Sequence, residues 1–151
     1  MPRVRGADKL RKLGRDLRQA ANKDLTKKLY AGINRPVKPF RAAVKAETAT
    51  LPSGYAPIMS RSLQIRVSTR TRGRGAGIRI VVSANGRSQL RDVAAVNAGR
   101  LRHPAWGRRG RWYTTTVTPG FVDRPTNAMA DDIRREVEHV VDDIADQLER
   151  G

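Results

Sequence analysis

Only two histidines, His103 and His139, could serve as general bases or imidazole metal ligands, and the chain contains no cysteine. His103 precedes a proline, and His139 falls on the polar side of a predicted helix. No zinc-binding HExxH spacing is present, so a metal ion would have to recruit distant carboxylates. We therefore predict no metal site, with His103 packed in a loop and His139 exposed to solvent.

Carboxylates gather near the C-terminus, at Asp131, Asp132, Asp142, Asp143 and Asp146. Carboxylate pairs perform acid–base catalysis where a cleft drives their pKa values apart, whereas these fall on the polar face of a predicted helix. The sequence has no nucleophile-elbow motif and no Walker lysine motif, and "GRGAG" has no predicted helix behind it. We predict that the chain is not an enzyme and takes no cofactor. The acidic helix is instead a candidate interface.

The charge of the chain is strongly positive and unevenly distributed. The 151 residues carry 31 Lys and Arg against 14 Asp and Glu, for a net charge of +17. Residues 1–120 hold 27 basic and 5 acidic side chains, while residues 121–151 hold 4 and 9. A basic body attracts polyanions. We expect the acidic segment to pair instead with a basic surface, either on the same chain or on a neighbouring subunit.

The most basic short segment is "RTRGRGAG", which links two predicted strands. Its arginines, Arg70, Arg72 and Arg74, together with Arg79 in the second strand, are candidates for an interface or DNA-facing arm. The alternatives are a solubilising loop or an arm that docks on an acidic subunit surface. We expect a mobile tip and sequence-independent contacts, because no RNP pattern, aromatic stacking platform or recognition helix is present.

Hydrophobic periodicity predicts an α+β fold, with helices at both ends of a small antiparallel sheet. We expect a basic amphipathic helix over 8–33, a weaker helix over 38–49, a loop at 51–57 and a turn at 84–88. Alternating residues predict strands over 62–69 and 77–83, and β-branched and aromatic residues predict another over 112–118. A short helix is expected over 89–98. These elements make one domain, with a helical part at 8–50, a sheet part at 61–118 with its arm at 70–77, and a C-terminal helix at 123–150.

The basic helix over 8–33 is open to several interpretations. Such a helix can lie on a membrane or hold DNA, but it is more often a packed helix with a charged outer face. The longest apolar runs, such as Ile80–Val82, are too short to span a bilayer. The basic start "MPRVRG" is not followed by an apolar stretch, so we expect no secretory signal.

The C-terminal helix has the clearest pattern. An apolar stripe runs through Met129, Ile133, Val137, Val140 or Val141, Ile144 and Leu148. Asp123 is a candidate N-cap, and Asp131 and Arg135 are spaced for an i, i+4 ion pair. The hydrophobic fraction of 38% gives a thin core, which oligomerisation could complete.

Residues 102–121 hold the most unusual motifs, which are followed by this C-terminal helix. They are Arg102-His103-Pro104, Trp106-Gly107, Trp112 and Pro119-Gly120-Phe121. Their order resembles the neck or tail-completion family of long-tailed bacteriophages, the type called "gene product ten" in lambdoid phages. Upstream, "LPSGYAPIMSRSLQIRV" is similar to that family's Pro/Gly loop and first strand. The resemblance covers about residues 58–150.

The resemblance implies a structural virion protein at the head–tail junction, assembled in the host cytoplasm. It would form a homo-oligomeric ring, hexameric or dodecameric, around the DNA channel. Its partners would be the phage connector or adaptor, the tail terminator and the tail-tube protein, with unspecific DNA contact and no membrane. His103, Trp106, Trp112 and Phe121 would then be scaffold, and Pro104 and Pro119 would fix the entry and exit of a loop.

Two other functions fit the sequence. A tail terminator or a head-side stopper ring shares the size and class of a tail-completion protein. A cellular, sequence-independent nucleic-acid-binding protein fits the charge alone.

Overall fold

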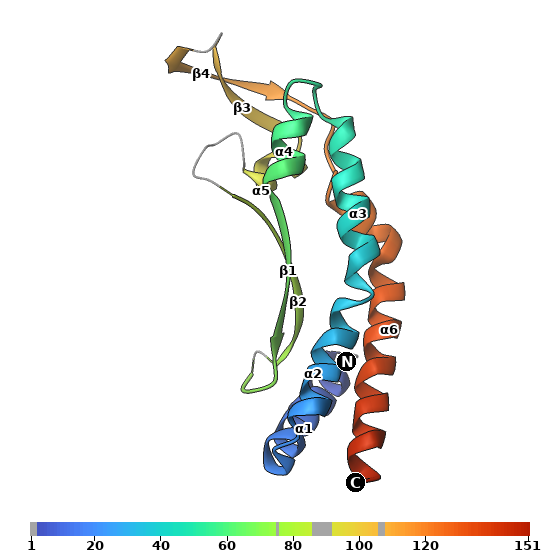
Figure 1. Cartoon of the computed structure of the whole chain (residues 1–151). Helices are drawn as coiled ribbons and strands as arrows, with labels where there is room; N and C mark the ends of the chain where they lie inside the picture. Colours follow the sequence, from blue (N-terminus) through green and yellow to red (C-terminus); the bar gives the residue numbers. More distant parts are fainter. Residues whose placement is uncertain (1–2, 75, 86–91, 106–107) are drawn as a thin grey trace. The chain divides into compact units, whose positions relative to one another are not determined.

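The computed structural model describes residues 3–74, 76–85, 92–105 and 108–151 (Figure 1). The chain has an α+β fold, as predicted. Its helices are α1 (Arg3–Ala20), α2 (Lys23–Asn34), α3 (Val37–Glu47), the 3-10 turn η1 (Thr48–Thr50), α4 (Ala56–Ser62), α5 (Val93–Asn97) and α6 (Asp123–Glu149). Its strands are β1 (Leu63–Arg70), β2 (Gly77–Ala84), β3 (Arg100–Ala105) and β4 (Arg108–Thr116).

The chain divides into two compact units, and several elements run through both. Unit 1 comprises Met1–Lys38, Val67–Ile80 and Ala130–Gly151, and unit 2 comprises Pro39–Arg66 and Val81–Met129. The single domain predicted over 1–151 stays a prediction. Within the described residues, no helix combines the length and the apolar character that crossing a membrane requires.

The core of unit 1 is a leucine-rich cluster contributed by α1, α2 and α6. Its buried members are Leu10, Leu13, Leu17, Leu25, Leu29, Ile33, Val141 and Ile144. Val67 of β1 and Ile78 of β2 pack against the cluster from the hairpin. The spacing of three and four residues places each helix's apolar side chains on one face, and each buried leucine contributes about 1.5–3 kcal/mol.

The prediction of a single helix over 8–33 is wrong, because Ala21 and Asn22 separate two helices, α1 and α2. Ala21 takes a positive φ of 50° and ends α1. The Asn22 side chain then caps α2, accepting a hydrogen bond from the backbone N–H of Leu25 at 3.1 Å. An asparagine cap satisfies one of the unpaired N–H groups at the start of a helix, so a new helix can begin here. The leucines of α1 and α2 nevertheless pack in the same cluster.

Unit 2 also buries apolar side chains, and Phe121 is the largest fully buried side chain among the described residues. The other buried apolar residues of this unit are Phe40, Val44, Leu51, Tyr55, Met59, Leu63, Ile65, Val96, Leu101, Ala105 and Val117. Arg124, in the first turn of α6, donates hydrogen bonds to the Glu47 carboxylate at 2.8 Å and the Thr50 hydroxyl at 3.2 Å. These bonds join the start of α6 to the end of α3 and to η1.

The helix predicted over 38–49 is confirmed as α3 and η1. Pro39 falls in the first turn of α3, where a missing N–H donor breaks no helical bond. The loop predicted at 51–57 is too long, because α4 begins at Ala56. Pro57 lies at the start of α4, so this proline opens a helix instead of prolonging the loop.

The strands form two separate two-stranded sheets, β1–β2 and β3–β4, instead of one small sheet. The β1–β2 hairpin matches the predicted strands. The loop predicted around Arg102, His103 and Pro104 is wrong, since these residues lie in β3, which pairs antiparallel with β4. Proline is tolerated in a strand at a sheet edge or beside a bulge, because it has no N–H to donate. Both conditions hold here, since a two-stranded sheet has only edge strands and the register shifts after Pro104.

The start of α6 is capped from outside the helix, so the prediction of Asp123 as N-cap is wrong. The side-chain oxygen of Asn97, at the end of α5, accepts hydrogen bonds from the backbone N–H groups of Val122 at 2.9 Å and Asp123 at 3.2 Å. Asp123 is the first residue of the helix itself. Part of the helix predicted over 89–98 exists as α5, while 86–91, including most of the predicted turn at 84–88, lie outside the described residues.

Candidate interaction surfaces

The acidic face of α6 is exposed to solvent. Asp131, Asp132, Asp142 and Asp143 are all exposed. The i, i+4 pair predicted between Asp131 and Arg135 is wrong, because the partners are one residue closer. Asp131 pairs with Arg134 at 3.7 Å, and Asp132 pairs with Arg135. A spacing of three residues also brings helical side chains together, so both arginines neutralise a carboxylate of their own helix.

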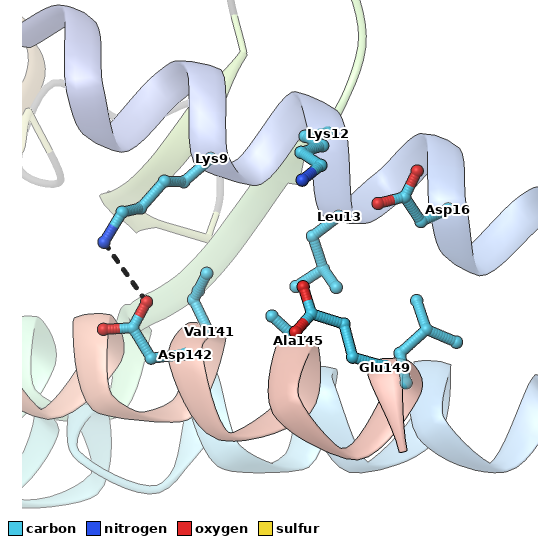
Figure 2. Close-up of a pocket in the computed structure, with 9 residues that line it drawn as sticks. Lys9, Lys12, Leu13, Asp16, Val141, Asp142, Ala145 and Glu149 are labelled. Carbon is cyan, nitrogen blue, oxygen red and sulfur yellow. Dashed lines mark hydrogen bonds and ion pairs between the residues drawn. The ribbon is translucent and has the colours of Figure 1, made fainter. Parts of the chain in front are cut away.

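An open groove lies between α1 and α6 in unit 1 (Figure 2). It has a volume of about 340 Å³, and it is lined by Lys9, Lys12, Leu13, Asp16, Val141, Asp142, Ala145, Leu148 and Glu149. The ammonium of Lys9 lies 3.3 Å from the Asp142 carboxylate, across the groove. Both side chains are more than half exposed, so this ion pair adds little stability. The sequence left open whether the acidic segment pairs on its own chain or on a neighbouring subunit, and Asp142 has a basic partner, Lys9, on its own chain.

The tip of the β1–β2 hairpin contacts α1 through Thr71 and Gly73, and the mobility predicted from its glycines stays a prediction. Arg18 of α1 donates a hydrogen bond to the Thr71 hydroxyl at 3.2 Å, and Arg11 donates one to the Gly73 carbonyl at 3.4 Å. A Cβ atom at Gly14 would lie 2.5 Å from the Cβ atom of Thr71. The absence of a side chain at Gly14 therefore lets the tip approach the helix backbone.

The four arginines predicted to form an arm remain exposed around this docked tip. Arg70, Arg72, Arg74 and Arg79 are all solvent-exposed. Their guanidinium groups are accessible, while the backbone that carries them is held at Thr71 and Gly73. Whether they contact a subunit surface or DNA stays a prediction.

The motif Pro119-Gly120-Phe121 forms a turn around a buried aromatic ring. Phe121 is completely buried, and Gly120 has a φ of +88°, which favours glycine. The backbone N–H of Gly120 donates a hydrogen bond to the Asn97 carbonyl at 2.8 Å. Pro119 is exposed, and its carbonyl accepts a hydrogen bond from Arg124. This turn leads the chain from β4 into α6.

The first half of the motif behaves differently, because Trp112 does not fill the core. Its side chain is 37% exposed, and that of the neighbouring Tyr113 is 53% exposed. The Arg102 guanidinium lies over the Trp112 ring, 5.8 Å from its centre. Trp112 therefore lies partly at the surface, and the scaffold role implied for it stays a prediction. Trp106 and Gly107 lie outside the described residues.

The two histidines occupy separate environments. His103 is half-buried on β3, and its Nε2 atom lies 2.7 Å from the Thr115 hydroxyl on β4. His139 is exposed on α6, as predicted. Across the described residues, no group of three His, Cys, Asp or Glu side chains could hold a metal ion.

Sequence reasoning missed several residues that shape these surfaces. Asn97 was not recognised as the cap of α6, although an asparagine that ends one helix near another is a candidate cap. Gly14 and Thr71 gave no local signal, because their contact joins positions far apart in the sequence. Tyr113 was overlooked beside Trp112, although adjacent strand residues point to opposite faces and both cannot enter the same core.

The comparisons with known proteins give no relative for this chain. No protein-family model, curated protein sequence or solved structure matches it.

Proposed function

We propose that this chain is a structural protein of the head–tail junction of a long-tailed phage. It would act as a neck or tail-completion subunit in a homo-oligomeric ring, joining the capsid connector to the tail around the DNA channel. Such a subunit needs surfaces for its neighbours and no catalytic residues. Its location would be the virion, after assembly in the host cytoplasm.

The observation that carries the proposal is the exposure of opposite charges within unit 1. Carboxylates of α6, among them Asp132 and Asp143, are exposed, and so are the arginines around the hairpin tip, including Arg72 and Arg74. A closed ring of identical subunits needs two different surfaces that complement each other. A chain that exposes both signs of charge can supply them, because each subunit offers the acidic surface to one neighbour and the basic surface to another.

The motif order gives a second line of support. The motif order that resembles the phage family includes Pro119-Gly120-Phe121, and in this chain a completely buried Phe121 anchors the turn that leads into α6. The burial of Phe121 supports the scaffold role that the resemblance implies for this residue.

DNA and the other proteins of the junction are the remaining partners of the proposal. Arg70, Arg72, Arg74 and Arg79 would meet the connector or adaptor, the tail terminator, the tail-tube protein or DNA in transit. DNA has to pass through the channel, so contacts to it should be weak and independent of sequence.

The test is the solution mass of the purified chain, measured by light scattering across a salt series, alone and with candidate connector and tail-tube proteins. The proposal expects a ring, alone or on a partner ring, that dissociates as salt rises, because exposed charges are screened. A ring that survives high salt contradicts the electrostatic interface. A chain that stays monomeric with every junction partner contradicts the proposal itself.

The same mass measurements distinguish two alternative functions from the proposed one. A tail terminator or a stopper ring would also assemble, but would bind the tail tube alone or the connector alone. A cellular nucleic-acid-binding protein would stay monomeric and bind free DNA or RNA tightly, with a steep loss of affinity as salt rises.

A further inference from the structure

The outward face of the β3–β4 hairpin combines arginines with an exposed aromatic ring. Arg100 pairs with Thr116, Arg102 with Thr114 and Pro104 with Trp112 in the register. Strand side chains alternate between faces, so Arg100, Arg102 and Trp112 share one face. The opposite face of β3 carries Leu101 and Ala105, which are both buried. The hairpin is therefore anchored on one side through β3 and presents the arginine face to solvent.

The β4 strand of this hairpin is more exposed than β3, which packs through Leu101 and Ala105. Residues 110–116 of β4 are all exposed. Two-stranded ribbons are marginally stable in water until another strand or a packed surface covers them. Tryptophan, tyrosine and arginine are also the residues that contribute most often to binding energy at protein interfaces. The composition and the exposure of the face both indicate a binding surface.

The charge of the hairpin identifies the chemistry of its partner. Residues 93–122 contain five arginines and no aspartate or glutamate. A partner that covers this face must supply carboxylates or another anion, since bringing more positive charge against it would be repulsive.

A second copy of this chain carries a matching acidic surface on α6. Asp132, Glu136 and Asp143 are exposed and recur at steps of four and seven residues, so they lie on one side of the helix. Asp132 pairs with Arg135, whereas Glu136 and Asp143 form no ion pair within the described part of the chain. These two carboxylates are therefore available to arginines from outside.

We propose that the β3–β4 hairpin of one subunit binds the acidic side of α6 in a second copy. Arg100 and Arg102 would face Glu136 and Asp143 there. The choice of a second copy as partner rests on the ring of the proposed function. The contact is heterologous, because two different surfaces meet, and each subunit therefore keeps one free copy of each surface for the next subunit.

Nucleic acid is the competing anion, and the geometry of the hairpin favours a protein partner. Bases bind tryptophan by stacking on its ring. Here the Arg102 guanidinium already lies over one face of the Trp112 ring. This arrangement holds the arginine in place for a carboxylate while it covers part of the surface on which a base would stack.

The first experiment reverses charges in the full-length chain and measures self-association by sedimentation at low salt. Arg102→Glu should weaken self-association about tenfold or more, because it sets like charges against α6. Combining it with Asp143→Arg should restore much of the loss. Arg15→Glu is the matched control, an identical charge change at an exposed position of α1 outside the proposed surfaces, and should change association less than about twofold. Equal losses from Arg102→Glu and Arg15→Glu would overturn the proposal, since net charge alone would then explain them.

A second experiment tests the contact without changing the arginines. The chain has no cysteine, so single cysteines can be placed without background reaction. We expect Thr114→Cys chains mixed with Asp143→Cys chains to form a covalent dimer with a short bismaleimide linker. Thr114→Cys mixed with Lys27→Cys, an exposed position on α2, should not.

The outcomes separate this proposal from the ring itself. A ring that forms without the Thr114–Asp143 cross-link overturns the hairpin contact and leaves the proposed function standing. A cross-linked assembly that never closes or binds junction proteins supports the contact and contradicts the proposed function. Loss of DNA binding in Arg102→Glu, with unchanged self-association, would overturn the contact in favour of nucleic acid.

Discussion

The two arginine-bearing hairpins of this chain differ in what lies against them. The tip of β1–β2 contacts α1 through Thr71 and Gly73, and Val67 and Ile78 join the core of unit 1. In β3–β4, β3 buries Leu101 and Ala105, but β4 is exposed along residues 110–116. Both hairpins are basic, and only the second presents a strand without cover.

The difference shows that local composition does not identify a binding arm. The glycines and arginines of "RTRGRGAG" are typical of a mobile segment, but Gly14 on a distant helix provides the space in which Thr71 packs. Conversely, the aromatic content of β4 is typical of a core strand, yet 37% of the Trp112 side chain and 53% of the Tyr113 side chain are exposed. The partner of each hairpin decides its role, and that partner is remote in the sequence or on another molecule.

The largest expected effect is on stability, and it should differ between the second half of the motif at 102–121, which holds Phe121, and the exposed strand β4. Phe121→Ala should lower the free energy of unfolding by about 3–5 kcal/mol, because it removes a completely buried ring and leaves a cavity. Tyr113→Ala, at an exposed position, should change it by less than about 0.5 kcal/mol. Urea unfolding followed by circular dichroism measures both. A similar loss in the two variants would mean that β4 is covered in solution.

The docking of the β1–β2 tip is tested by adding one methyl group. Alanine in place of a helical glycine normally stabilises by about 1 kcal/mol, but at Gly14 the new Cβ would meet Thr71 at 2.5 Å. We expect Gly14→Ala to destabilise the chain by about 1–2 kcal/mol through overpacking.

Two further variants identify the cause of the Gly14 effect. Gly6→Ala in the same helix meets no atom within 4 Å and should be neutral or stabilising. Adding Thr71→Gly to Gly14→Ala should recover part of the loss, because it removes the atoms of the clash. If Gly14→Ala proves as stable as Gly6→Ala in thermal unfolding, the tip does not lie on α1.

A smaller effect is expected at the base of the second hairpin, where Asn97 caps α6. Asn97→Ala should reduce stability by about 1 kcal/mol, because the N–H groups of Val122 and Asp123 lose their acceptor. Asn97→Asp keeps an acceptor oxygen and should retain most of the stability. Differential scanning calorimetry of the two variants provides the comparison, and equal losses would show that the side-chain oxygen is not the cap.

Elements with strong periodicity could be predicted from the sequence. The stripe from Met129 to Leu148 located α6, and alternation located β1 and β2. The break at Ala21 was missed because the leucine spacing continues through it, although Asn22 followed by an acidic first turn is a recognisable helix start. β3 was missed because Pro104 disfavours a strand unless the strand is an edge or carries a bulge, and only the pairing shows that.

The surfaces were harder to predict than the elements. Charge and exposure placed the acidic residues of α6 and the arginines of the tip correctly on the surface. The docking of the tip required Gly14 and Thr71 to be brought together by folding. The partial exposure of Trp112 was not predicted, although it shares a strand face with Thr114 and Thr116, and these polar neighbours indicate the solvent side.

The smallest expected effect concerns the acidic helix that the second hairpin is proposed to bind. Lys9 and Asp142 form an ion pair at 3.3 Å with both side chains more than half exposed. A double-mutant cycle with Lys9→Ala and Asp142→Ala should give a coupling below about 0.5 kcal/mol, lost at high salt. A coupling this small means that α1 barely engages the carboxylate of Asp142, which stays available to other cations. A coupling above about 1 kcal/mol would instead show that Asp142 is committed to α1.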